Sequence, residues 1–180
     1  MSQDHDIERL LIDQALSGAV QRQIRKVIET AARTVRRLQP TPDGISGMRE
    51  SQLRNVVNVA IDAQSVTEVA AFILYQMGRS TNSRQWLYGD FGHAVVADLT
   101  ARDRDDGVVR AALAARDEAL AALKASGVAE PEPERRQAML DEAHIALARQ
   151  YLGYLNRLFY YAERANGWDR LHSLTEARHD

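Results

Sequence analysis

The stretch SVTEVAAFILYQMGRSTNSRQWLYGDF, from Ser65 to Phe91, decides the fold. It opens with Ser65 and Glu68 in the Ser-x-x-Glu spacing of a capping box, in which each side chain binds a free amide of the first helical turn. Gly78 is placed to end the helix, because glycine enters the left-handed conformation without a Cβ penalty. Between these two signals the apolar residues recur at helical spacing, at Val66, Val69, Ala70, Ile73 and Met77. The stretch therefore predicts a helix, a polar loop over 79–85 and then an aromatic segment.

Aromatic residues are concentrated in two parts of the chain. Five of the eleven lie in this stretch, and the other six lie between Tyr151 and Trp168. Large rings bury more area than other side chains. We therefore expect the two stretches to meet in the core.

The rest of the chain is predicted to be helical as well. Apolar residues keep helical spacing in several further segments, and the composition has few prolines and many helix formers. The predicted helices span residues 5–16, 19–38, 47–62, 93–101, 108–125 and 134–166, with Ser17-Gly18 breaking or bending the path between the first two. These segments predict an all-α, single-domain helical bundle of about six or seven helices. Within it we distinguish an N-terminal helical extension with a basic face (1–45), a main bundle (46–166) and a polar tail (167–180).

Composition excludes several classes of function. The chain has no cysteine, which rules out disulfides and thiolate metal sites. It has no apolar run of membrane-spanning length, and its start is acidic and polar rather than signal-like, so we expect a cytoplasmic protein. Phosphate-cradling glycine loops, nucleophile elbows and His-Glu-x-x-His motifs are also missing. We therefore expect no catalytic residues and no cofactor.

Positive charge is unevenly distributed although the net charge is -2. Residues 19–60 contain eight basic side chains and three acidic ones. On the predicted 19–38 helix, Arg22, Lys26, Arg33 and Arg37 fall close to one line. Such a line can contact backbone phosphates, or it can simply be a solvated face. Arg49, Arg54, Arg79 and Arg84 form a possible second basic patch.

The histidines suggest a weaker alternative. Four of the five follow an acidic residue by three positions, a spacing that places both side chains on one helix face. Helical bundles that bind two metal ions use this spacing together with inward glutamates from two more helices, which this sequence lacks. Local salt pairing is the other interpretation. The pairs are Asp90/His93, Asp141/His144, Asp169/His172 and Glu176/His179.

Three short motifs resemble a known family. They are Gln52-Leu53-Arg54-Asn55, Tyr75-Gln76-Met77-Gly78-Arg79, and the run Tyr154-Leu155-Asn156-Arg157-Leu158-Phe159-Tyr160-Tyr161. Together they resemble the small helical subunit of type III CRISPR effector complexes, most closely that of the Csm-type complex. The resemblance spans about residues 46–165. It implies a non-catalytic all-α protein that stacks in copies and contacts guide and target RNA through basic residues, Arg54 and Arg79 first. This chain differs in its extra N-terminal helix and in not being basic overall.

The sequence thus predicts a small, non-catalytic subunit of an RNA-guided, antiviral ribonucleoprotein that binds the RNA backbone and neighbouring subunits. The candidate contacts are the eight basic residues named above. Two rivals remain open. One is a protein-binding scaffold or dimerisation module that binds no nucleic acid. The other is a metal-dependent bundle enzyme using His93 and His144 with Asp90 and Asp141.

Overall fold

The structure is a computed structural model that describes residues 2–79 and 83–176, with side chains described from residue 6 onward and again from residue 84. Within these ranges the chain is an all-α bundle, and an isolated bridge between Thr41 and Gly44 is the nearest approach to a strand. Six helices have ten or more residues. In chain order the elements are α1 (Ser2–Val35), η1 (Arg36–Leu38), α2 (Glu50–Asp62), α3 (Val66–Gly78), α4 (Ser83–Leu87), η2 (Tyr88–Asp90), α5 (Phe91–Thr100), α6 (Val108–Ala125), α7 (Pro133–Ala165) and α8 (Arg170–Thr175).

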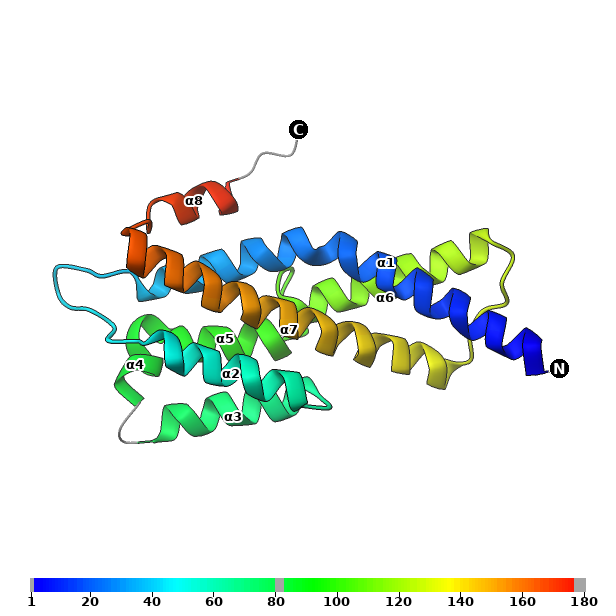
Figure 1. The fold of residues 1–180 in the computed structure, drawn as a ribbon, viewed down its shortest axis with the longest axis horizontal. Coiled ribbons are helices and arrows are strands. Elements are labelled where there is room, and N and C mark those ends of the chain that lie inside the picture. Colours follow the sequence, from blue (N-terminus) through cyan, green and yellow to red (C-terminus); the bar gives the residue numbers. More distant parts are fainter. Residues whose placement is uncertain (1, 80–82, 177–180) are drawn as a thin grey trace.

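The bundle is elongated along its two longest helices (Figure 1). Helices α1, α6 and α7 pack against one another, and α2 packs on α7. Helices α3 and α5 pack together beside α2, and α8 folds back onto α1. The predicted all-α, single-domain bundle is confirmed. Helix α1 contributes buried side chains such as Leu16, Val27 and Val35 to the common core.

The expected break at Ser17-Gly18 is wrong. Helix α1 runs through both residues without interruption. A glycine inside a helix costs only ~1 kcal/mol relative to alanine, and burial outweighs this cost here. Leu16 and Ala19 on either side of the pair are both buried in the same core.

Helix α3 forms where the sequence predicts it, but its ends differ in detail. Ser65 caps the start, since its Oγ accepts a hydrogen bond from the Glu68 amide. The Glu68 carboxylate accepts from the Ser65 hydroxyl at 2.9 Å rather than from a backbone amide. At the other end the helix stops at Gly78 without a left-handed glycine, because Arg79 follows in an extended conformation.

Both aromatic stretches contribute to one core. Trp86 stacks against Phe91, with ring centroids 5.6 Å apart, and Phe159 meets Trp168 edge-on at 6.3 Å. These ring pairs lie within each stretch, and the two stretches share the core through the aliphatic residues between them. Not every ring is buried, because Tyr75, Tyr160 and Tyr161 remain exposed.

Two short helices were not predicted. Helix α4 lies in the segment expected to be a polar loop, and α8 lies in the expected polar tail. Buried anchors explain both, since Trp86 and Leu171 enter the core at these points.

Among the described residues, none of the helices has both the length and the apolar composition needed to cross a bilayer.

Candidate nucleic-acid interface

The line of Arg22, Lys26, Arg33 and Arg37, called here the α1 stripe, runs along α1 into η1, and two of its four side chains are paired with carboxylates. The Nε of Arg22 donates to Glu118 of α6 at 2.9 Å, and Arg33 donates to Asp106 at 2.6 Å, just before α6 begins. All four side chains of the stripe are exposed, yet these two have a carboxylate partner on a neighbouring element. Half of the stripe therefore forms an ion-paired seam between helices.

A cleft of about 370 Å³ lies along this seam, between α1 and the start of α6. Its lining is of mixed charge: the cations Lys26, Arg33 and Arg110 are accompanied by four carboxylates. A polyanion entering the cleft would meet more acids than bases, four against three. The acidic residues of the lining are Glu29, Asp105, Asp106 and Asp117.

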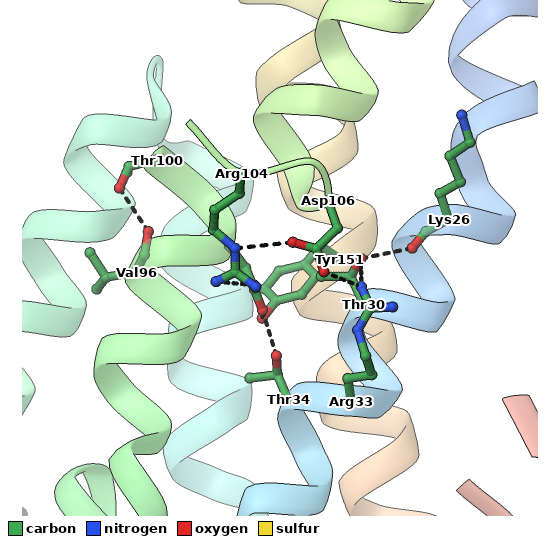
Figure 2. A network of polar contacts seen from close by, with 10 residues as sticks. Lys26, Thr30, Arg33, Thr34, Val96, Thr100, Arg104, Asp106 and Tyr151 are labelled. Atoms are coloured by element: carbon green, nitrogen blue, oxygen red, sulfur yellow. Dashed lines mark hydrogen bonds and ion pairs between the residues drawn. The ribbon is translucent and has the colours of Figure 1, made fainter. Parts of the chain in front are cut away.

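Beneath the cleft lies a buried polar network that fixes the loop between α5 and α6 (Figure 2). Asp98 is 1% exposed and its Oδ2 accepts from Thr34 of α1 at 2.5 Å and from Tyr151 of α7 at 2.7 Å. Arg104 approaches its other oxygen at 3.2 Å and also binds Asp106. The network thus joins α1, α5, α7 and the loop.

Burial controls the ionisation of this network. It raises the pKa of Asp98 above its ordinary value, although the hydrogen bonds from Thr34 and Tyr151 and the charge of Arg104 oppose the shift. Burial also raises the pKa of the Tyr151 hydroxyl well above its ordinary value, and the neighbouring Asp98 adds to this. Tyr151 is therefore a hydrogen-bond donor, not an acid that gives up its proton near neutral pH.

The remaining candidate cations gather at one end of the bundle. Figure 1 shows the start of α2, the end of α3 and α4 meeting at that end, and Gly89 lies against the Arg37 carbonyl there. Arg37 also belongs to this end, because its guanidinium donates to the Gly89 carbonyl at 3.1 Å. We call this group the basic end. It consists of Arg37, Arg49, Arg54, Arg79 and Arg84, all exposed.

Most of these guanidinium groups are not neutralised. Arg54 forms an ion pair with Glu50 one turn earlier on α2. Arg79 lies over the ring of Tyr75, 5.5 Å from its centroid, and that ring is 59% exposed. Among the described residues, no carboxylate pairs with Arg37, Arg79 or Arg84, nor with Arg49. Of the eight predicted residues, Arg22 and Arg33 are therefore paired beside α6, and the basic end contains four arginines without a carboxylate partner among the described residues.

The opposite end of the bundle is acidic. There α1 and α7 begin, and the arginines are paired: Arg135 binds both Asp13 and Glu142, and Arg136 binds Glu130. Glu132 and Glu134 add further exposed negative charge at the start of α7. Charge is thus unevenly distributed along the length of the molecule.

The acid–histidine pairs do not assemble into a metal centre. His93 binds Asp90 at 2.8 Å on the exposed surface. His144 instead donates from Nε2 to the Leu99 carbonyl at 2.7 Å, and burial lowers its pKa. No group of three or more potential metal ligands occurs among the described residues, and His179 lies outside them.

Sequence reasoning missed a second set of arginines, on the exposed face of α7. Arg157 lies over Tyr154, with 5.4 Å from its guanidinium carbon to the ring centroid, and Arg164 lies over Tyr160 at 5.5 Å. The spacings of three and four residues signal such pairs on a helix. Helical spacing alone predicts these tyrosines to be core residues, and it does not distinguish the exposed Tyr160 from a buried ring.

Comparison with known proteins finds no matching family model, no matching curated protein and no matching solved structure.

Proposed function

We propose that this chain is a non-catalytic, RNA-binding subunit of a ribonucleoprotein, and that RNA contacts its basic end. The carrying observation is that Arg37, Arg49, Arg79 and Arg84 gather at one end of the bundle without a carboxylate partner among the described residues. Guanidinium groups at such a surface bind phosphates without needing a base sequence. The proposal implies a cytoplasmic protein and involves no cofactor.

The resemblance to the small subunit of type III CRISPR complexes supports the same proposal. Two of the residues that carry it, Arg54 and Arg79, lie at the basic end. The first of these has a carboxylate partner and the second does not. We therefore rank Arg79 above Arg54 as an RNA contact. Within the α1 stripe, Arg37 and Lys26 rank above Arg22 and Arg33, whose charges are used in ion pairs with other elements.

The exposed start of α1 favours a second role, contact with neighbouring protein subunits. Ile7 and Leu10 are 57% and 69% exposed on the first turns of α1. Exposed apolar groups that cluster in this way are typical of protein interaction sites. A scaffold module that binds protein alone would use this surface and would not need the basic end.

Purification of the tagged, full-length chain from its native host tests the proposal. We expect a short RNA of uniform length and larger protein subunits to accompany it, and nuclease treatment to release or shorten that RNA. As a control, the same preparation from cells that express the variant with Arg37, Arg49, Arg79 and Arg84 changed to glutamine should contain less RNA. Recovery of the wild-type chain with a protein partner and no RNA would overturn the proposal and favour the scaffold.

A further inference from the structure

The C-terminal half of α7 presents a surface that the fold leaves uncovered. Tyr160 and Tyr161 are 46% and 41% exposed, and Arg157 and Arg164 are exposed beside them. Tyr154 is half-buried at the margin and packs partly on the core. These five residues share one side of the helix, because at about 3.6 residues per turn their side chains point within roughly one third of a turn of one another. We call this surface the α7 strip.

The chemistry of the α7 strip matches a single-stranded nucleic acid. Each of its two arginines lies over a tyrosine ring, so cations and exposed aromatic faces alternate along the helix. Bases stack on aromatic side chains and on guanidinium planes, and phosphates pair with the arginine charge. Between residues 150 and 165 the acidic residue is Glu163, at the edge of the strip, so positive charge exceeds negative charge there.

A protein partner is the alternative occupant, because tyrosine and arginine are also enriched in protein interfaces. The unpaired positive charge of the strip favours RNA, since charged residues are depleted in the core of a protein interface. The neighbouring leucines Leu152 and Leu155 are buried in the core and do not belong to the strip. At Gly153, within the same exposed sector, an added Cβ would contact nothing within 4 Å, so the backbone there is also open.

We propose that the α7 strip is a second RNA contact, in which Tyr154 and Tyr160 stack on bases while Arg157 and Arg164 hold the adjoining phosphates. The inference rests on the proposed function and extends it from backbone contact to base stacking. Figure 1 supports the connection, because the end of α7 lies at the same end of the bundle as the start of α2 and the end of α3. One strand of RNA can therefore extend from the basic end onto the strip.

Two probes of equal charge separate stacking from charge. One is a fluorescein-labelled oligouridylate, and the other is its abasic counterpart, which keeps the phosphates and lacks the bases. Both are titrated at low salt with the full-length protein. Tyr160→Leu, alone and with Tyr154→Leu, removes the rings and keeps apolar volume for packing; the corresponding Tyr→Phe variants restore the rings. Far-ultraviolet circular dichroism checks that each variant is folded.

We expect the double leucine variant to bind oligouridylate at least about fivefold more weakly than the wild type, because each stacked base contributes to affinity. Its affinity for the abasic probe should not change, and both phenylalanine variants should bind as the wild type does. If the wild type binds oligouridylate and the leucine variants bind it equally well, this inference is overturned and the proposed function is not. If the wild type binds neither the oligouridylate nor the abasic probe, the proposed function is overturned as well. Concentration-dependent self-association that is lost in Tyr160→Leu, with RNA affinity intact, would assign the strip to protein contact instead.

Discussion

At the scale of single residues, the most constrained group is the buried carboxylate of Asp98. Three donors from three different elements satisfy it: Thr34, Tyr151 and Arg104. A buried charge that loses a partner is costly because water cannot replace the lost hydrogen bond. The network therefore holds the loop before α6 in place, and through that loop it positions Asp106, which pairs with Arg33.

Removing one donor tests this role. Tyr151→Phe deletes the hydroxyl and keeps the buried ring, so we expect the free energy of unfolding to fall by about 1–3 kcal/mol. Urea denaturation followed by circular dichroism measures the change. Tyr160→Phe is the matched control, since it deletes a hydroxyl from an exposed ring, and it should change stability by less than about 0.5 kcal/mol. Equal stability of the two variants would show that the Asp98 network does not stabilise the fold.

His144 predicts a pH dependence of stability. Burial lowers its pKa in the folded chain, while the nearby Asp141 and the bond to Leu99 act in the opposite direction and Arg102 reinforces the shift. In the unfolded chain the pKa is about 6.5, so on acidification the unfolded state binds this proton first. The free energy of unfolding should therefore fall as the pH drops below about 6.5. It falls until the lower folded pKa is passed.

The measurement compares urea midpoints of the wild type and His144→Gln between neutral and mildly acidic pH. The wild type should lose more stability over this range than the variant does. His93→Gln, at an exposed histidine, is the control and should follow the wild type. The assignment to His144 fails if the wild type and His144→Gln have the same pH dependence.

At the scale of elements, close approaches of backbone fix how the short helices dock. Gly89 has φ of 55° and follows α4, and a Cβ there would lie 2.4 Å from the Arg37 carbonyl oxygen. Helix α2 is held from the other side, because Arg149 of α7 donates to the carbonyls of Ala60, Ile61 and Ala63 at its C-terminal end. A cation at this position also complements the helix dipole. The Gly89 contact lies at the basic end, and the Arg149 contacts fix the other end of α2.

Two glycine substitutions should have opposite effects. Gly89→Ala should destabilise the protein by about 2 kcal/mol or more, since it adds left-handed strain to a clash with backbone. Gly153→Ala, inside α7 and free of any contact within 4 Å, should stabilise it by about 0.5–1 kcal/mol. Thermal and urea unfolding of both variants provide the measurement. A Gly89→Ala protein as stable as the wild type would contradict the described packing of η2 against η1.

At the scale of the whole molecule, features that depend on nearby residues can be predicted from the sequence, whereas contacts that depend on how one helix packs on another cannot. Apolar spacing predicted most helices and the capping by Ser65, because these features depend on residues a few positions apart. The pairing of Arg22 with Glu118 joins residues 96 positions apart and depends on how α1 docks on α6. Sequence therefore located the cations but could not separate paired arginines from open ones. Glycine is the usual left-handed residue after a helix, but at the end of α7 Asn166 takes this conformation and the adjacent Gly167 does not. Gly167 instead makes room for the Tyr161 ring.

The most direct test of the central claim, that RNA binds at the basic end, is the salt dependence of binding to single-stranded RNA. The wild type is compared with two quadruple glutamine variants of the full-length chain. In one the basic end is changed, at Arg37, Arg49, Arg79 and Arg84. In the other, the paired-set variant, four arginines that form ion pairs with carboxylates are changed, at Arg22, Arg33, Arg135 and Arg136.

We predict that log affinity falls linearly with log salt, with a slope of about -0.7 for each phosphate contact. The basic-end variant should lose most of this slope, and the paired-set variant should retain it. An unchanged slope in the basic-end variant, or equal losses in the two variants, would contradict the account.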